Sequence, residues 1–296
     1  MDIKNYLQEK RQSIDSYLIS YLEAPSAPSV LNEAMKYSLF AGGKRIRPIL
    51  ALTSYEACGG DPAKIIPQAA ALELIHTYSL IHDDLPAMDN DELRRGKPTS
   101  HKVFGEAIAI LAGDALLTEA FLMMANGASN GGAINPTCLL KAVREVALSA
   151  GANGMVGGQA QDILSENSEP DADTLEFIHL HKTAALITAS VRMGPILADS
   201  TRDKLYSLTR YGECIGLAFQ IIDDVLDVEG TTEELGKSAG ADSKKKKLTY
   251  PLLFGIEGAR QKAKDLIESA TDALCIFSSE AGPLREIAKY LGERRA

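Results

Sequence analysis

The chain of 296 residues is poor in the residues that build disulfide frameworks and zinc sites. Its four cysteines are scattered and form no Cys-x-x-Cys pair, a pattern that argues against a zinc site and is typical of single thiols in a reducing compartment. A chain of this length can bury a large core without such crosslinks. We therefore expect a cytoplasmic protein whose four thiols are free, namely Cys58, Cys138, Cys214 and Cys275.

The sequence also lacks an excess of basic charge and any long apolar run. The 31 Lys and Arg residues stand against 40 Asp and Glu residues, which gives a formal charge of −9 and a pI near 5.2. This balance argues against nucleic-acid binding. No uninterrupted apolar stretch approaches the length of a membrane span, and the N-terminal segment has no signal-peptide pattern. If the ligand is an anion, something other than net charge must attract it.

What the chain does have is helical periodicity. Apolar residues recur at three- and four-residue spacing, which predicts long helices rather than strands. We expect helices over Ile65 to Leu85, Glu106 to Ala125, Leu175 to Leu197, Lys204 to Val228 and, in pieces, Pro251 to Ala281. Loops are expected at 59–62, 127–136, 151–158, 165–170 and 230–243, where Gly, Pro, Asn, Asp and Ser gather. The prediction is one all-α domain over residues 1–296, a large bundle of long antiparallel helices.

Aspartates gather where two of these helices end. Asp83 and Asp84 lie on the last turn of one helix, and Asp89 lies beyond a proline, from where it can fold back towards them. Asp223 and Asp227 stand four residues apart on one face of another apolar helix. Like charges at this spacing repel each other, and a cluster of carboxylates without His or Cys favours an ion that prefers oxygen ligands, such as Mg²⁺. The plainer interpretation is two solvated helix ends.

Basic residues accompany both clusters. Lys44 and Arg47 lie three residues apart, and Arg94 and Arg95 follow the first aspartates directly. Arginine forks beside a metal site suit bidentate recognition of phosphate. His76 lies seven residues before Asp83, nearly on the same helical face. A surface patch of ion pairs and a structural histidine remain the alternative interpretation.

With these residues assembled, the chain resembles the trans-isoprenyl diphosphate synthases, and among them the bacterial farnesyl diphosphate synthases. The matching segments are GGKRIRP at 42–48, HDDLPAMDNDELRRGKPT at 82–99, GGQAQD at 157–162, HKT at 181–183, FQIIDDVLD at 219–227, GK at 236–237 and KLTYP at 247–251. The resemblance implies an all-helical domain around a deep central cavity, paired as a homodimer.

The resemblance also implies roles. Three Mg²⁺, for which Mn²⁺ can substitute, would be held by Asp83, Asp84, Asp89, Asp223 and Asp227. Isopentenyl diphosphate would bind Lys44, Arg47, His76 and Arg95, and the allylic diphosphate would bind Arg94, Lys182, Lys237 and Lys247. Thr183, Gln220 and the Lys182 carbonyl would lie beside the reacting carbons, where Thr183 and Gln220 could equally be ordinary packing residues. We expect the segment from Gly236 to Leu248 to close over the diphosphate.

The resemblance extends to product length. The chain would grow past the helix that carries Asp83, and at about 1.5 Å per residue Tyr78 and Ser79 lie roughly 6–8 Å deeper. Family members with an aromatic residue at the position of Tyr78, and four residues such as LPAM between the aspartates, tend to stop at C15. This predicts (2E,6E)-farnesyl diphosphate, made from dimethylallyl or geranyl diphosphate by ionisation to an allylic cation. The alternative product is geranylgeranyl diphosphate, and Tyr78 could simply pack in the core.

Other functions fit less of the sequence. The adjacent His82 and Asp83 suggest a metal-dependent phosphohydrolase, but the remaining histidines lack the positions such a site needs. A terpene cyclase would share the first aspartate cluster but not the second, nor need Lys44 and Arg47. A non-catalytic regulatory subunit would typically lose one cluster, and both are present here.

Overall fold

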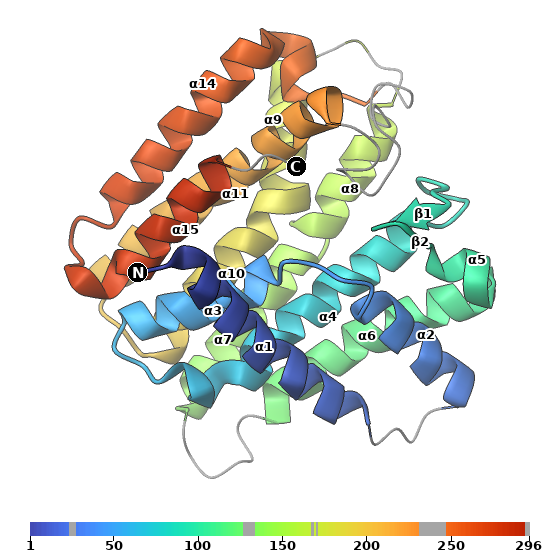
Figure 1. Ribbon diagram of the computed structural model, residues 1–296, viewed down its shortest axis with the longest axis horizontal. Helices are drawn as coiled ribbons and strands as arrows, with labels where there is room; N and C mark the ends of the chain where they lie inside the picture. Colours follow the sequence, from blue (N-terminus) through green and yellow to red (C-terminus); the bar gives the residue numbers. More distant parts are fainter. Residues whose placement is uncertain (24–27, 127–133, 167–168, 170, 231–246, 294–296) are drawn as a thin grey trace.

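The computed structural model describes residues 1–23, 28–126, 134–166, 169, 171–230 and 247–293, and in them the protein is almost entirely helical (Figure 1). This confirms the all-α prediction. The elements in chain order are α1 (Ile3–Leu22), α2 (Ser29–Leu39), α3 (Ile46–Ala57), η1 (Pro62–Ile65), α4 (Ile66–Asp83), β1 (Leu93–Arg94), β2 (Lys97–Pro98), α5 (Ser100–Phe104), α6 (Glu106–Asn126), α7 (Pro136–Ala150), α8 (Met155–Leu164), α9 (Ala172–Ile178), η2 (His179–Ala184), α10 (Ala185–Leu197), α11 (Arg202–Glu229), α14 (Tyr250–Ala273), η3 (Ser279–Ala281) and α15 (Gly282–Gly292).

The predicted helix boundaries agree closely with the long helices. α4, α6 and α11 begin and end within three residues of the positions that the periodicity predicted. Thr201 directly precedes α11 and is its N-cap, because its hydroxyl accepts a hydrogen bond from the Lys204 backbone N–H. The region predicted in pieces after Pro251 is α14, which is interrupted by Gly255 at φ 72°, followed by η3 and α15. Each of these interruptions coincides with glycine or a turn.

Two local predictions differ from the structure in detail. The stretch from Leu175 to Leu197 is not one regular helix, because η2 is a π-helical turn between α9 and α10. The expected loop over 151–158 ends early, since α8 already begins at Met155. The two segments in which these differences lie pack against each other. A Cβ on Gly158 would lie 2.2 Å from the backbone nitrogen of Lys182, so this glycine stays in a helix that packs directly on η2.

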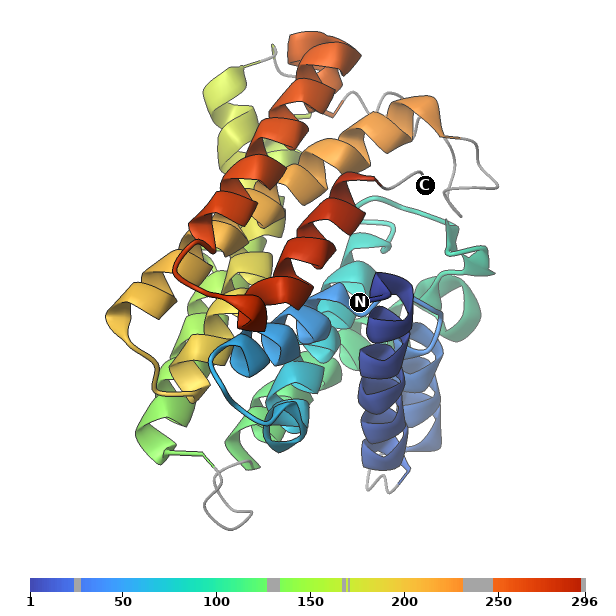
Figure 2. The ribbon, with the colours of Figure 1, turned by 60° about the vertical axis from the view of Figure 1, so that its left-hand side comes forward.

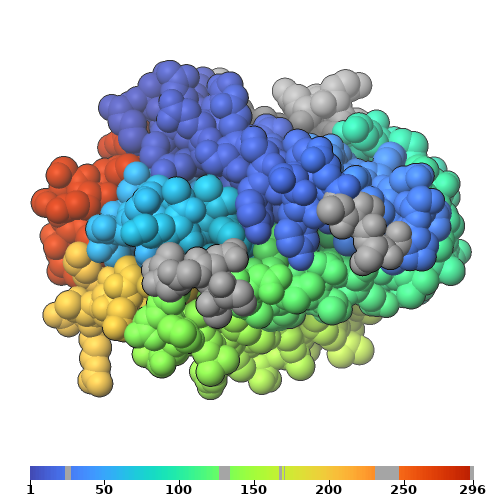
Figure 3. Space-filling view, turned by 90° about the horizontal axis from the view of Figure 1, so that it is seen from below, coloured from blue at the N-terminus to red at the C-terminus, as the bar shows by residue number. Residues whose placement is uncertain are grey.

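The core lies between the long helices. α4 packs against α6, α10 packs against α3 and α11, and α11 packs against α14 (Figures 1 and 2). Figure 3 views the molecule from below, where elements of the first half of the chain, blue to green, cover most of the face. Fully buried side chains such as Leu50, Leu74, Leu116 and Tyr211 come from four different helices. Apolar burial between helices is therefore what fixes the ends of α4 and α11 in space.

α6 is the most apolar of the long helices, although it carries Glu106, Asp114 and Glu119. Among the residues described, α6 is the one helix whose length and mean hydropathy of 1.8 would allow it to cross a membrane. Of its most apolar 18-residue stretch, 39% is buried inside the protein. One such helix is weak evidence for a membrane span, because a helix in the core of a soluble protein can have the same length and hydropathy. α6 packs against α4, α2 and α5.

Candidate active site

A cavity of about 790 Å³ opens between the helices and joins both aspartate clusters to the basic segments. It thereby confirms the expected central cavity. The predicted site residues that line it are Lys44, Arg47, His76, Asp83, Asp89, Arg94, Arg95, Lys182, Thr183, Gln220, Asp223 and Lys247. Asp84, Asp227, Tyr78 and Ser79 are described but are not among its lining residues. Lys237 and most of the predicted closing segment, residues 236–246, lie outside the described residues.

The loop after α4 turns back as the sequence predicted. The backbone N–H of Asp89 donates to the carbonyl oxygen of Asp83 over 2.8 Å, which returns Asp89 to the end of the helix. Burial raises the pKa of Asp83 to about 6, and Asp89 adds to this shift while Lys182 opposes it. Carboxylates that raise each other's pKa at a partly buried position favour a cation beside them.

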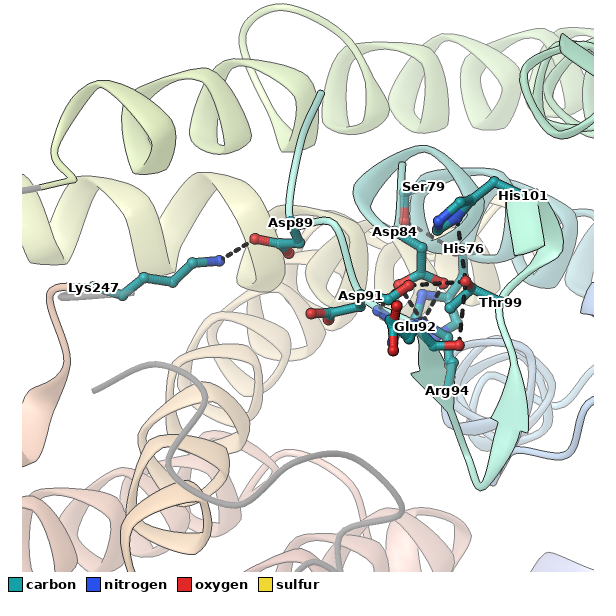
Figure 4. A network of polar contacts seen from close by, with 10 residues as sticks. All are labelled: His76, Ser79, Asp84, Asp89, Asp91, Glu92, Arg94, Thr99, His101 and Lys247. Atoms are coloured by element: carbon teal, nitrogen blue, oxygen red, sulfur yellow. Dashed lines mark hydrogen bonds and ion pairs between the residues drawn. The ribbon is translucent and has the colours of Figure 1, made fainter. Parts of the chain in front are cut away.

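Asp84 and Arg94 are paired with each other. The Arg94 guanidinium donates from Nε and Nη2 to both carboxylate oxygens of Asp84 over 2.6–2.9 Å (Figure 4). Burial raises the pKa of Asp84, and the hydrogen bonds from Arg94 oppose that rise. In this arrangement the acid predicted to bind metal neutralises the base predicted to bind diphosphate. To fill their predicted roles, Asp84 and Arg94 would have to separate, with Asp84 binding the metal ion and Arg94 the diphosphate.

A two-residue hairpin presents the neighbouring arginine. β1 pairs with β2 in antiparallel register, and the connecting Arg95 and Gly96 have φ of 53° and 75°. Positive φ at both central positions is the geometry of the tight turns that favour hairpins. Thr99, which follows β2, anchors the hairpin to the residues that precede β1. Its N–H donates to the Glu92 carbonyl and its hydroxyl donates to the Asp91 carbonyl (Figure 4).

The glycine pair before Lys44 makes room for this arginine. Arg95 Nη1 donates to the carbonyl oxygen of Gly42, and a Cβ on Gly43 would lie 2.7–3.0 Å from the guanidinium atoms. Gly42 and Gly43 also have φ of 108° and 127°, which other residues rarely adopt. Glycine is therefore needed at these two positions before α3, because the Arg95 side chain lies directly against their backbone.

Arg47, Arg95 and His76 form a cluster in which basic groups lie close together. The pKa of His76 lies well below its usual value, first because of burial and then because Arg47, Arg95, Arg94 and Arg45 surround it. Burial also lowers the pKa of Arg47. Nε of Arg47 is buried and finds no hydrogen-bond partner within the described ranges. A buried donor in a positive field is what a bound phosphate oxygen would satisfy.

Arg45 belongs to the scaffold beneath the cluster, and sequence reasoning missed it. This arginine is 3% exposed, has a φ of 53°, and donates to Asp15, Glu73 and the Leu39 carbonyl, each over 2.8 Å. It ties the start of α3 to α1 and α4. Arg45 lies directly after Lys44 and two residues before Arg47, and nothing in the sequence marks its separate role.

Two lysines bridge the acids at the cavity. Lys182 Nζ lies 2.6 Å from Asp162 Oδ2, and Lys247 Nζ lies 2.8 Å from Asp89 Oδ1 and 3.5 Å from Asp162 Oδ2. Asp162 is the last residue of the GGQAQD segment, which sequence reasoning noted without assigning it a role. The lysines predicted to bind diphosphate are thus held by carboxylates at the place where the diphosphate is expected.

The second cluster divides into three different environments. Asp223 and Asp224 both line the cavity, Asp224 is also buried in a hydrogen-bond network, and Asp227 is buried on the same helix without lining the cavity. Thr183 donates from its hydroxyl to Gln220 Oε1 over 2.6 Å, so the pair predicted to face the reacting carbons is in contact. Thr183 lies in η2, and π-helical turns occur frequently at functional sites.

The acids fit a magnesium ion without forming a complete cage. Among the described residues, no group of three His, Cys, Asp or Glu side chains is arranged to hold an ion. Mg²⁺ usually takes one or two carboxylates and completes its shell with water and substrate phosphates. The all-oxygen donor set and the raised pKa of Asp83 suit such an ion. The residues present therefore fit Mg²⁺ that arrives with its substrate.

Tyr78 and His82 lie on the side of α4 that faces α6. Their rings meet edge to face with centroids 5.8 Å apart, and His82 Nε2 lies 3.1 Å from the Ile110 carbonyl oxygen. Burial, followed by Asp83, raises the pKa of Tyr78 to about 12. Ser79 donates to the His76 carbonyl of its own helix. His82 does not line the cavity, which removes the observation that suggested a phosphohydrolase.

Known proteins resemble this chain over almost its whole length. The family model described as polyprenyl synthetase matches residues 28–275. Geranylgeranyl pyrophosphate synthase 12, chloroplastic, of Arabidopsis thaliana is 46% identical over 297 residues, which cover 99% of this chain and 82% of that protein. The geranylgeranyl diphosphate synthase of Cyanophora paradoxa is 46% identical over 294 residues, covering 99% and 97%. The solved apo structure of an FPP/GFPP synthase from Zymomonas mobilis is 39% identical with a TM-score of 0.86, covering 98% of this chain and 99% of that one.

Proposed function

The chain belongs to the polyprenyl synthetase family, and on that premise we propose that it extends an allylic diphosphate head to tail as far as geranylgeranyl diphosphate. Prenyl transfer of this kind is the family's activity. The C20 end product is supported by the names of relatives that are 46% identical over nearly the full chain. This proposal replaces the C15 product that the sequence around Tyr78 predicted.

One observation that carries the proposal is the single cavity that holds both a carboxylate mouth and a separate arginine cluster. A reaction between two diphosphates needs two anion sites of different character. At one, Asp83, Asp89 and Asp223 would hold Mg²⁺ with the allylic diphosphate. At the other, Lys44, Arg47 and Arg95 would bind isopentenyl diphosphate directly. Holding both substrates in one cavity makes the reaction between them effectively unimolecular, because their reacting carbons are already placed next to each other.

The residues of the cavity would stabilise the departing diphosphate and the allylic cation, and would keep water away from that cation. When bound, Mg²⁺ would stabilise the negative charge that develops on the departing diphosphate. Lys182 and Lys247 would move from their carboxylate partners to the phosphate oxygens, where they stabilise the same charge. Thr183 and Gln220 would present oxygen atoms to the allylic cation. Burial of the site would keep water from capturing that cation.

The C15 product remains a second candidate because two observations favour it. Tyr78 is an aromatic residue at the position associated with short products, and the Zymomonas mobilis structure is named as an FPP/GFPP synthase. Against it, α4 contributes Glu73, His76, Leu80 and Asp83 to the lining of the cavity, while Tyr78 is not among the lining residues. Tyr78 would limit chain length only if the growing chain displaced the side chains in front of it.

Product analysis separates these candidates. Purified protein would be incubated with isopentenyl diphosphate, Mg²⁺ and either geranyl or farnesyl diphosphate, and the products dephosphorylated and separated by chain length. The proposal predicts that farnesyl diphosphate is a substrate and that C20 accumulates from both starters. Accumulation of C15, with farnesyl diphosphate inert, would establish the second candidate. We further propose three Mg²⁺ for each site and a homodimer in solution, measurable by metal titration and sedimentation.

A further inference from the structure

Asp224, the middle aspartate of the second cluster, is engaged on both carboxylate oxygens. It is 3% exposed, and its Oδ1 accepts a hydrogen bond from Gln220 Nε2 over 2.8 Å. Its Oδ2 accepts from the backbone N–H of Tyr250 over 2.9 Å and lies 3.2 Å from His179 Nε2. These partners belong to α11, α14 and η2. The carboxylate is therefore fixed from three elements.

His179 contributes a donor to this arrangement. Its Nδ1 is buried and has no hydrogen-bond partner among the residues described, so the ring proton is best placed on Nε2, towards Asp224. The ring also stacks with that of Tyr250, with centroids 6.1 Å apart and planes 22° apart. His179 and Tyr250 hold one side of the carboxylate, and this leaves Oδ1 aimed at Gln220.

The network has a direction. Because a carboxylate offers acceptors only, the Gln220 amide must turn its Nε2 towards Asp224 and hence its Oε1 towards Thr183. The Thr183 hydroxyl then donates its one proton to that oxygen over 2.6 Å. The Thr183 hydroxyl therefore presents only its oxygen lone pairs to the cavity.

We propose that Asp224 is a positioning residue that sets the polarity of the Gln220–Thr183 pair, so that the pair faces the allylic cation with lone pairs rather than with a proton. This inference rests on the proposed function, since it concerns the cation formed in prenyl transfer. It assigns Asp224 a role distinct from metal binding by Asp223. An oxygen that faces a developing positive charge stabilises it, whereas an O–H directed at it does the reverse.

The isosteric substitution Asp224→Asn would reverse this polarity. The Tyr250 backbone N–H can only donate, so it keeps the asparagine oxygen on its own side and leaves the asparagine NH₂ facing Gln220. Gln220 would then turn its oxygen to that NH₂ and its own NH₂ to Thr183. The Thr183 hydroxyl would have to accept, and its proton would point into the cavity.

Steady-state kinetics test the proposal in a double-mutant cycle. We would measure kcat and both KM values for the unaltered protein, Asp224→Asn, Thr183→Val and the double variant, with melting temperatures to confirm folding. Asp224→Asn should lower kcat about 10- to 100-fold and leave KM for isopentenyl diphosphate unchanged. In the Thr183→Val background the same change should cost less than about threefold. Equal losses in both backgrounds, or an unchanged kcat, would overturn the proposal.

A charge-swapped variant keeps the test decisive if Asp224→Asn is unstable. In Asp224→Asn with Gln220→Glu, the asparagine NH₂ donates to the new carboxylate, whose other oxygen again accepts from Thr183. The number of charges and hydrogen bonds is preserved. A kcat at least about threefold above that of Asp224→Asn, or measurable turnover where that variant is unfolded, supports the assignment. A folded swap without such recovery contradicts it. Absence of condensation by the unaltered protein would overturn the proposed function as well.

Discussion

Lys247 Nζ lies 2.8 Å from Asp89 Oδ1, although the two residues are 158 positions apart in the chain. The same ammonium group lies 3.5 Å from Asp162, and Lys182 lies 2.6 Å from that carboxylate. Acids and bases of the cavity therefore neutralise each other in the absence of substrate. A diphosphate with Mg²⁺ would take over both sets of partners, the metal going to the acids and the phosphate oxygens to the lysines.

Lys247→Ala should weaken binding of the allylic diphosphate. Losing one cation at a partly buried site removes a charge-assisted hydrogen bond, for which we expect about a tenfold rise in KM for geranyl diphosphate. KM for isopentenyl diphosphate should stay the same, because the arginine cluster is unaltered. Lys264→Ala is the control, since Lys264 is an exposed lysine on α14. An unchanged KM for geranyl diphosphate in Lys247→Ala would show that this lysine does not reach the substrate.

Asp83→Asn should impair the use of Mg²⁺. Asp83 lines the cavity beside Asp89, and removing its charge leaves fewer anionic oxygens for the ion. We expect kcat to fall about 100-fold and the Mg²⁺ concentration for half-maximal rate to rise. Asp114→Asn, at an exposed aspartate on α6, is the matched control. The Mg²⁺ dependence of the rate measures both, and an identical dependence in Asp83→Asn would exclude this residue as a ligand.

Arg45→Met should destabilise the fold. The substitution leaves Glu73, which is buried, without its ion-pair partner, and breaking a buried pair costs about 3–5 kcal/mol of unfolding free energy. Arg11→Ala, which breaks an exposed pair with Asp15, should cost less than about 1 kcal/mol. Chemical denaturation followed by circular dichroism compares the two. Similar midpoints for both variants would mean that Arg45 is not the tie between α1, α3 and α4.

Tyr78→Ala tests whether the tyrosine limits chain length. If the growing prenyl chain passes Leu80 and reaches the α6 side of α4, removing the ring opens space and shifts the products to longer chains. Ser79→Ala is a suitable control, because the Ser79 hydroxyl is bonded to its own helix and removing it creates little space. Chromatography of the dephosphorylated products gives the answer. The same product lengths in Tyr78→Ala and the unaltered protein would confine Tyr78 to a packing role.

Much of the fold could be predicted from the sequence because it depends on local pattern. The periodicity placed α4 and α11 within three residues, and the proline after Leu85 predicted that the chain would leave the helix and return Asp89 to Asp83. These features depend on neighbours along the chain. Residue chemistry also indicated which acids and bases would gather, and twelve of the predicted site residues line the same cavity.

The parts that could not be predicted depend on contacts between distant segments. The π-helical turn η2 lies where Gly158 of α8 and Gly216 of α11 both press against its backbone, and no periodicity in 179–184 marks it. The pairing of Asp84 with Arg94 and the anchoring of Arg45 by Asp15 and Glu73 likewise depend on packing. A single sequence identifies candidate charges but not which of them neutralise one another.

The most direct test of two anion sites in one cavity is condensation itself. Protein, geranyl diphosphate, radiolabelled isopentenyl diphosphate and Mg²⁺ would be incubated with and without excess EDTA, and the acid-labile prenyl products extracted and counted. We predict labelled allylic products of C15 and longer with Mg²⁺ and none with EDTA. Labelled isopentenyl diphosphate that remains unincorporated in the presence of Mg²⁺ and geranyl diphosphate would contradict it.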